Sequence, residues 1–157
     1  MSPNDATLSV LYATAILSLK MWLCGTITTY VRGHSMQSPN REDEGVMNFF
    51  NTAFRVPTAT LEVLPSNAES HEPTNRWLRI CNNDVANIPI GLFVLYLAAV
   101  YSGLDSGLLV TLVWIFVAAR LAHTITYAYG IQPWRTVSYS VGATSMILAA
   151  ISLFWAG

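Results

Sequence analysis

The sequence predicts an all-α protein, an integral membrane bundle of four helices. Two observations carry this prediction. Hydrophobic residues make up 53% of the chain and charged residues only 11%, whereas soluble domains carry about 25% charged residues. In addition, four apolar runs each approach the roughly 20 residues that a helix needs to cross a bilayer. The chain of 157 residues is long enough for one domain, so we expect a single membrane domain over residues 1–157.

The four expected spans are separated by polar segments and by turns that contain Gly and Pro. The first, about 8–31, has no Lys or Arg before it and no small-residue cleavage site after it, which favours a retained span over a signal peptide. The second, about 76–101, begins polar and becomes apolar. The third and fourth, about 108–129 and 136–155, are separated by a turn that contains Gly and Pro. Short connections of this kind place consecutive helices antiparallel.

Basic residues set the orientation of such a bundle, because loops rich in Lys and Arg stay in the cytoplasm. The first and third connections, with the helix ends beside them, hold Arg32, Arg41, Arg55, Arg76, Arg79, Arg120 and Arg135. We therefore expect the long loop 32–75 on the cytoplasmic side and both termini on the other. The membrane itself stays open between the endoplasmic reticulum of a eukaryote and the inner membrane of a bacterium. A net charge of -1 gives no indication of a nucleic-acid partner.

The long loop contains an apolar stripe at helical spacing within residues 46–54. Such a stripe fits a short helix on the membrane surface, and it fits equally a loop that packs on its own subunit. The sequence leaves these two interpretations open.

Polar side chains inside the spans are costly and usually face the interior of a bundle. Arg76, Arg79 and Asn83 stand at positions i, i+3 and i+7 of the second span, and the third span repeats this spacing. Each set therefore lies on one helical face. The full group is Arg76, Arg79 and Asn83; Arg120, His123 and Tyr127; and Arg135 with Tyr139 on the fourth span.

This group has two interpretations. Topology brings it, with Arg32 at the end of the first span, to one level of the membrane, and several Arg side chains at one level suit a ligand with carboxylates. Alternatively, arginines near span ends extend to the interface and only set topology. The alignment on three helices favours a functional cleft.

One lysine lies in the middle of the first span. Lys20 needs a partner there, and Asp84 is the acidic residue within a predicted helix at similar depth. We expect a structural ion pair between these two side chains. Cys24 and Cys81 lack the spacing of metal ligands, so no metal site is expected, and we interpret both as reduced packing thiols.

The same residues resemble the MAPEG family, the membrane-associated proteins in eicosanoid and glutathione metabolism, and within it the branch of microsomal glutathione transferase and membrane prostaglandin E synthase. The similarity touches all four predicted helices, and the third-helix stretch is its most specific part. The matching stretches are Lys20-Met21, Pro39-Asn40-Arg41-Glu42-Asp43, Arg76-x-x-Arg79 followed by Asn83-Asp84, Ala119 to Tyr127, and Pro133-x-Arg135-x-x-x-Tyr139.

The resemblance implies a homotrimer of four-helix subunits that binds glutathione between neighbours. The glutathione-binding positions that it implies are Arg32, Arg79, Asn83, Arg120, His123, Tyr127, Arg135 and Tyr139, with Asp43 as possible support. Arg135, Thr136 and Tyr139 would act on the thiol, since a guanidinium favours the thiolate and a hydroxyl can donate a hydrogen bond to sulfur. A lipophilic substrate would arrive from the bilayer between the first and fourth helices.

The expected function is therefore that of a membrane glutathione transferase, which conjugates glutathione to lipophilic electrophiles and peroxides, or reduces or isomerises them. One departure matters, because Ala86 stands where the family usually has a Glu that would contact the ammonium of glutathione. This favours the alternative of a non-catalytic family member that binds lipid or a partner. A small transporter or channel subunit is a further alternative, although polar faces crowded at one level argue against a pore.

Overall fold

The structure, a computed structural model, describes residues 3–34 and 72–154. These residues form four α-helices, and each contains a stretch long and apolar enough to cross a membrane. The bounds are α1 (Pro3–His34), α3 (Glu72–Tyr101), α4 (Ser106–Ala128) and α5 (Trp134–Leu153). The predicted all-α, four-helix membrane fold is confirmed.

The helices of the first two spans are longer than predicted. α1 continues to His34, and α3 begins at Glu72 rather than near residue 76. Hydropathy marks the part of a helix that lies in lipid, whereas helical hydrogen bonding continues into polar residues. The predicted surface helix at 46–54 and the acidic Asp43 lie outside the described residues.

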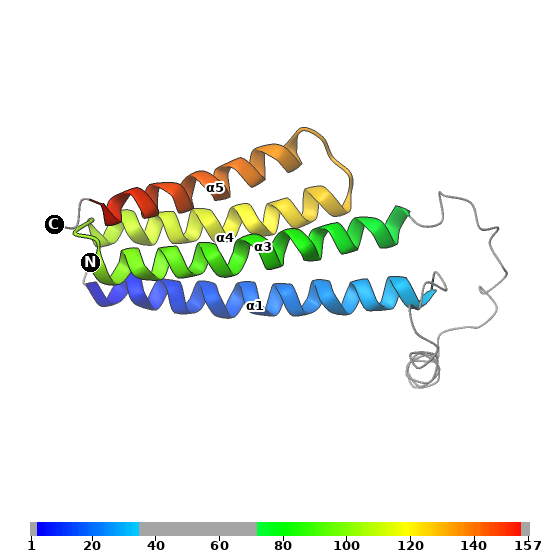
Figure 1. The fold of residues 1–157 in the computed structure, drawn as a ribbon, viewed down its shortest axis with the longest axis horizontal. Helices are drawn as coiled ribbons and strands as arrows, with labels where there is room; N and C mark the ends of the chain where they lie inside the picture. Colours follow the sequence, from blue (N-terminus) through cyan, green and yellow to red (C-terminus); the bar gives the residue numbers. More distant parts are fainter. Residues whose placement is uncertain (1–2, 35–71, 155–157) are drawn as a thin grey trace.

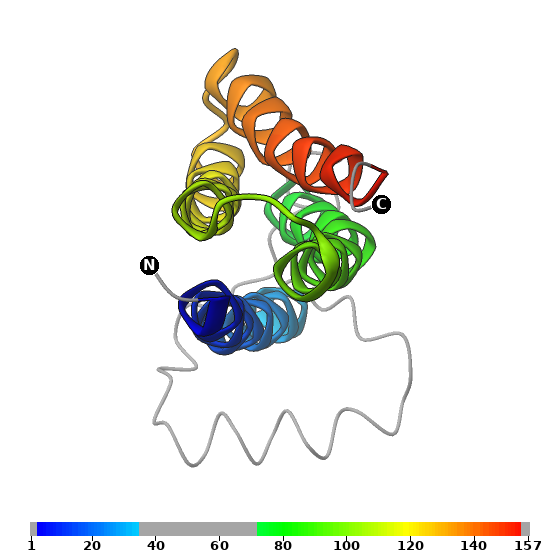
Figure 2. The ribbon, with the colours of Figure 1, turned by 90° about the vertical axis from the view of Figure 1, so that its left-hand side faces the viewer.

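The four helices run side by side, and consecutive helices are antiparallel (Figure 1). The N-terminus, the C-terminus and the α3–α4 connection lie at one end of the bundle, and the α4–α5 connection lies at the other (Figure 1). We call the latter the α4–α5 end. Seen along the bundle, α3 and α4 form the middle, with α1 on one side and α5 on the opposite side (Figure 2).

This arrangement changes the expected substrate route. α1 packs on α3 and α4, and α5 packs on the same two helices from the other side. In the described bundle the α3–α4 pair therefore lies between α1 and α5, so these two helices do not line a common gap there.

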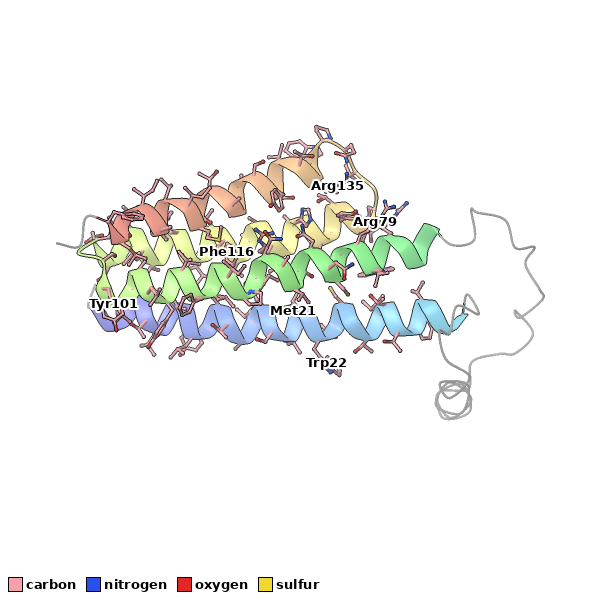
Figure 3. The ribbon with its side chains drawn as sticks, in the orientation of Figure 1. Met21, Trp22, Arg79, Tyr101, Phe116 and Arg135 are labelled. Carbon is pink, nitrogen blue, oxygen red and sulfur yellow. The ribbon has the colours of Figure 1, made fainter. Side chains whose placement is uncertain are left out.

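The bundle has an apolar core and an equally apolar outer surface. Leu17, Ile88 and Phe116 are fully buried between the helices. Trp22 is 65% exposed and points away from the bundle (Figure 3), and Phe93 is 63% exposed. Large apolar side chains on the outside are typical of a surface that faces lipid rather than water.

The start of α3 is tied to the end of α4. Arg76 Nη1 donates a hydrogen bond to the carbonyl oxygen of Ala128 at 3.1 Å, so its guanidinium satisfies a carbonyl in the last turn of α4. The chain then turns at Gly130, whose positive φ of 68° favours glycine. The Arg76 guanidinium lies close to this turn, since a Cβ placed on Gly130 would lie 3.4 Å from Arg76 Nη1.

Candidate functional site

Three helices contribute polar side chains to one cluster in the half of the bundle near the α4–α5 end. The predicted spacing on α4 brings Arg120, His123 and Tyr127 to one side of that helix, where they meet side chains of α3 and α5. We call this group the polar cluster, and its members are Asn83, Asn87, Arg120, His123, Tyr127, Arg135 and Tyr139.

Arg120 is the most deeply buried member, at 1% exposure. Its guanidinium carbon lies 5.2 Å from the ring centre of Phe116 and 5.3 Å from that of Tyr139, within the range of cation–π attraction. Its Nη1 donates to Asn83 Oδ1 at 3.5 Å. Within the described residues, Nε and Nη2 have no hydrogen-bond partner. A buried charge in a membrane bundle is costly without a partner, so these two nitrogens mark a place for an acceptor.

Two glycines make room for this arginine. A Cβ on Gly142 of α5 would lie 3.3 Å from Arg120 Nε and 3.3 Å from Ala119 Cβ. A Cβ on Gly91 of α3 would lie 2.3 Å from Cζ of Phe116, the ring beneath the guanidinium. The missing side chains therefore allow α3 and α5 to approach α4 closely around Arg120.

His123 connects α4 to the first turn of α5. Its Nδ1 lies 3.0 Å from the carbonyl oxygen of Arg135. A carbonyl only accepts, so Nδ1 carries a proton, and Nε2 of the neutral ring is left as an acceptor. Within the described part of the chain, Nε2 has no partner. The imidazole ring also contacts Tyr127 edge-on, with ring centres 5.6 Å apart, and Tyr139 at 5.9 Å.

The first turn of α5 lies at the more accessible rim of the polar cluster. The Arg135 guanidinium stacks over the Tyr127 ring, 4.5 Å from its centre. Thr136 is exposed, and its backbone N–H donates to the carbonyl oxygen of Pro133 at 2.9 Å. Tyr139 is 38% exposed and extends from this rim inward to Arg120.

One other predicted site residue, Arg79, stays apart from the cluster. Arg79 lies at the same end of the bundle as Arg135 (Figure 3), but its side chain is exposed and makes no contact with Arg120 or His123 among the described residues. Arg32 belongs to the last turn of α1.

Lys20 and Asp84 form an ion pair between α1 and α3, the contact that the sequence predicts. Lys20 Nζ donates to Asp84 Oδ2, and the two side chains are only 8% and 2% exposed. Asp84 Oδ1 has no partner within the described residues. The predicted packing role of the cysteines agrees with the nearby contact of Cys81 Sγ with Thr28 Oγ1 at 3.1 Å.

A comparison with family models identifies the family of the chain. The model of the MAPEG family matches residues 9–155, nearly the whole chain. The chain belongs to the MAPEG family. The match spans all four helices and every member of the polar cluster, so the resemblance read from the sequence is confirmed at the level of the family. No curated protein matches the chain significantly.

Sequence reasoning missed one member of this MAPEG protein's cluster. Asn87 of α3 donates from Nδ2 to the carbonyl oxygen of Asn83 at 2.7 Å and approaches the Tyr139 hydroxyl with Oδ1 at 3.5 Å. The sequence contained a signal for this residue, because Asn87 is a polar residue in an apolar span and stands four positions after Asn83, on the same helical face. The supporting roles of Gly91 and Gly142 carried no such signal.

Proposed function

We propose that this MAPEG protein is a glutathione-dependent membrane transferase that acts on lipophilic electrophiles or peroxides. One observation supports it above the others. Arg120 is buried in the bundle with two guanidinium nitrogens that have no partner among the described residues. Glutathione carries two carboxylates, and Arg is the residue best suited to bind a carboxylate through two parallel hydrogen bonds.

The charge balance of the interior supports an anionic ligand. Lys20 and Asp84 form an ion pair, whereas the direct contacts of the Arg120 guanidinium among the described residues are the amide oxygen of Asn83 and two aromatic rings. The described interior therefore carries an excess positive charge, which is unfavourable in a medium of low dielectric constant. A carboxylate beside Arg120 would remove this cost, and Tyr127 and the Nε2 acceptor of His123 would orient the rest of the peptide.

The rim of the cluster supplies groups for the thiol. A free thiol has a pKa of about 8.5, so little of it is ionised at neutral pH, and the thiolate is the nucleophile. Arg135 lies at the rim and would favour the thiolate by its charge. Thr136, the next residue, presents an exposed hydroxyl that would donate a hydrogen bond to sulfur. In a conjugation, the thiolate sulfur would then form a bond to an electrophilic carbon of the lipophilic substrate, and the leaving group of that carbon (chloride in a chlorinated aromatic compound) would depart. Arg135 and Thr136 would stabilise the thiolate and form no covalent bond themselves.

A neighbouring subunit fits this proposal. Arg79 is exposed, and Arg32 belongs to α1, the helix that packs on α3 and α4 from the side opposite to α5. A homotrimer would allow these two arginines, with Asp43, to reach the glutathione of an adjacent subunit. Measuring the mass of the protein in detergent by light scattering tests the assembly, and a monomer would contradict it. We infer an integral membrane location, in the endoplasmic reticulum or a bacterial inner membrane, with the long loop cytoplasmic.

The alternative is a MAPEG protein that binds lipid or a partner without catalysis, and Ala86 favours it. Ala86 is exposed on α3, one turn after Asn83, and its methyl group cannot bind the ammonium of glutathione. Calorimetric titration with glutathione separates the two functions. The proposal expects saturable binding, with S-methylglutathione as a control that keeps both carboxylates. No binding of either compound to the folded protein would contradict it.

Catalysis is tested by conjugation of glutathione to a small chlorinated aromatic compound. We expect wild-type turnover, a loss of at least tenfold in Arg135→Ala, and partial retention in Arg135→Lys, which keeps the charge. This size follows from about one pKa unit of thiol activation, which corresponds to about 1.4 kcal/mol. Wild-type activity equal to that of Arg135→Ala, with glutathione bound normally by both, would reject the role of Arg135.

A further inference from the structure

Four residues of the polar cluster form a closed ring of contacts across three helices, one of them through its backbone carbonyl. Arg120 Nη1 donates to Asn83 Oδ1 at 3.5 Å, and Asn87 Nδ2 donates to the backbone oxygen of Asn83 at 2.7 Å. The Tyr139 hydroxyl donates to Asn87 Oδ1 at 3.5 Å. The Tyr139 ring closes the circuit, because it stacks on the Arg120 guanidinium at 5.3 Å. Asn87 is the member that joins Tyr139 to α3.

The orientation of the Asn87 amide follows from its own partner. A backbone carbonyl only accepts, so the group that contacts Asn83 O must be the Asn87 NH₂. The amide oxygen is therefore the atom that faces Tyr139, and it can only accept. In this contact the Tyr139 hydroxyl is the donor, because the Asn87 oxygen only accepts.

We propose that Asn87 is a positioning residue for glutathione, which acts by holding Tyr139 over Arg120 and by occupying the tyrosine's proton. This inference rests on the proposed function. Tyr139 then shields and orients the guanidinium that receives the carboxylate, and it does not donate to the sulfur. The hydrogen bond to the thiolate falls to Thr136, whose exposed hydroxyl has no partner among the described residues.

The position of Asn87 argues against a role in packing alone. It lies within the apolar part of α3, where a polar side chain costs free energy unless its hydrogen bonds are satisfied. Both ends of its amide are used, one within α3 and one on α5. An apolar residue of similar size would pack there but would release the hydroxyl of Tyr139.

The test compares Asn87→Ala, Tyr139→Phe and the double variant, and measures both the dissociation constant of glutathione by calorimetry and the pKa of the bound thiol by its thiolate absorbance. Each single variant should weaken glutathione about three- to tenfold, the loss of one neutral hydrogen bond, and the double variant should be no weaker than either. The pKa of the bound thiol should stay unchanged. Asn82→Ala, which removes an exposed amide of the same helix, is the matched control and should bind like wild type.

A substitution at the rim should have the opposite effect and change the pKa of the bound thiol rather than the affinity. Thr136→Val should raise the pKa of the bound thiol by about one unit and leave the dissociation constant of S-methylglutathione unchanged. The proposal is overturned if Tyr139→Phe raises the thiol pKa, or if the losses in Asn87→Ala and Tyr139→Phe add in the double variant. A structural role alone would lower stability without this separation of affinity from thiol pKa.

Failure of the proposed function is recognised separately. If wild type does not bind glutathione, the proposed function fails, and the contact of Asn87 with Tyr139 is still tested by thermal unfolding in detergent. If the decreases in melting temperature of the two single variants do not add in the double variant, the contact between Asn87 and Tyr139 is supported. If they add, the contact is contradicted. If Asn87→Ala does not fold, Tyr139→Phe carries the test, because it removes the same hydrogen bond from the α5 side and retains an aromatic ring at this position.

Discussion

The ion pair between Lys20 and Asp84 allows a quantitative prediction about what holds α1 against α3. Both side chains are nearly inaccessible, at 8% and 2% exposure, and Nζ donates directly to Oδ2. Replacement of Asp84 by Asn keeps the shape of the side chain and removes its charge. The ammonium of Lys20 then stays in the bundle without a counter-charge.

The expected cost can be worked from this burial. At about 4 Å and an effective dielectric constant of about 20, two unit charges attract by about 4 kcal/mol. Removal of one partner of a buried pair typically costs about 3–5 kcal/mol, because the other charge is left uncompensated. Asp84→Asn and Lys20→Met should each lower the free energy of unfolding by this amount. The double variant should cost less than the sum of the two, and can approach the wild-type stability.

Titration with a denaturing detergent, followed by circular dichroism, measures these free energies for a helical membrane protein. The decisive quantity is the coupling energy of the double-variant cycle, which removes the separate effects of each substitution. We expect a coupling of at least about 2 kcal/mol, because each single variant should cost about 3–5 kcal/mol and the double variant less than their sum. Additive costs, or an Asp84→Asn variant as stable as wild type, would refute the structural role of the pair.

Three further predictions concern the surroundings of the polar cluster. Gly142→Ala places a Cβ 3.3 Å from Arg120 Nε, so we expect a loss of about 1–3 kcal/mol of stability and weaker glutathione binding. Gly25→Ala is the control and should show neither effect, because its added Cβ meets nothing within 4 Å. Gly91→Ala, with its Cβ 2.3 Å from the Phe116 ring, should be more destabilising than Gly142→Ala in the same unfolding titration. Ala86→Glu should tighten glutathione binding about tenfold through a charge-assisted hydrogen bond, and calorimetry should show no such gain for a glutathione analogue that lacks the amino group.

The fold was predictable because a bilayer imposes a simple rule on the sequence. Backbone groups cannot stay unpaired in lipid, so long apolar runs must be helices, and their number and order follow from hydropathy. The ends of the helices were less predictable. The polar residues from Glu72 onward are helical although they lack the hydropathy of a membrane span, and the contact of Arg76 with α4 stabilises this part of α3. Connection lengths also gave the antiparallel order that Figure 1 shows.

The candidate site was predictable only in part, because spacing gives a helical face but not what that face meets. The i, i+3, i+7 pattern of Arg120, His123 and Tyr127 survives as a side-chain cluster in the structure. The residues of the same pattern on α3 do not stay together, since Asn83 joins the cluster and Arg79 is exposed. Which residues meet depends on how α3 and α5 cross α4, and glycines without a chemical signal set that approach.

The depth of Arg120 connects the fold to the proposed chemistry. It lies eight residues before the end of α4, roughly 12 Å inside at 1.5 Å per residue. A guanidinium at this depth cannot reach the interface by extending its side chain, so topology alone does not account for it. Its cost is offset by two aromatic rings and one amide oxygen in the described residues, which leaves a positive charge for a ligand to balance. Tyr139 is the partly exposed side chain that contacts the Arg120 guanidinium, so under the proposed function the affinity for glutathione should depend on how firmly Asn87 holds that ring.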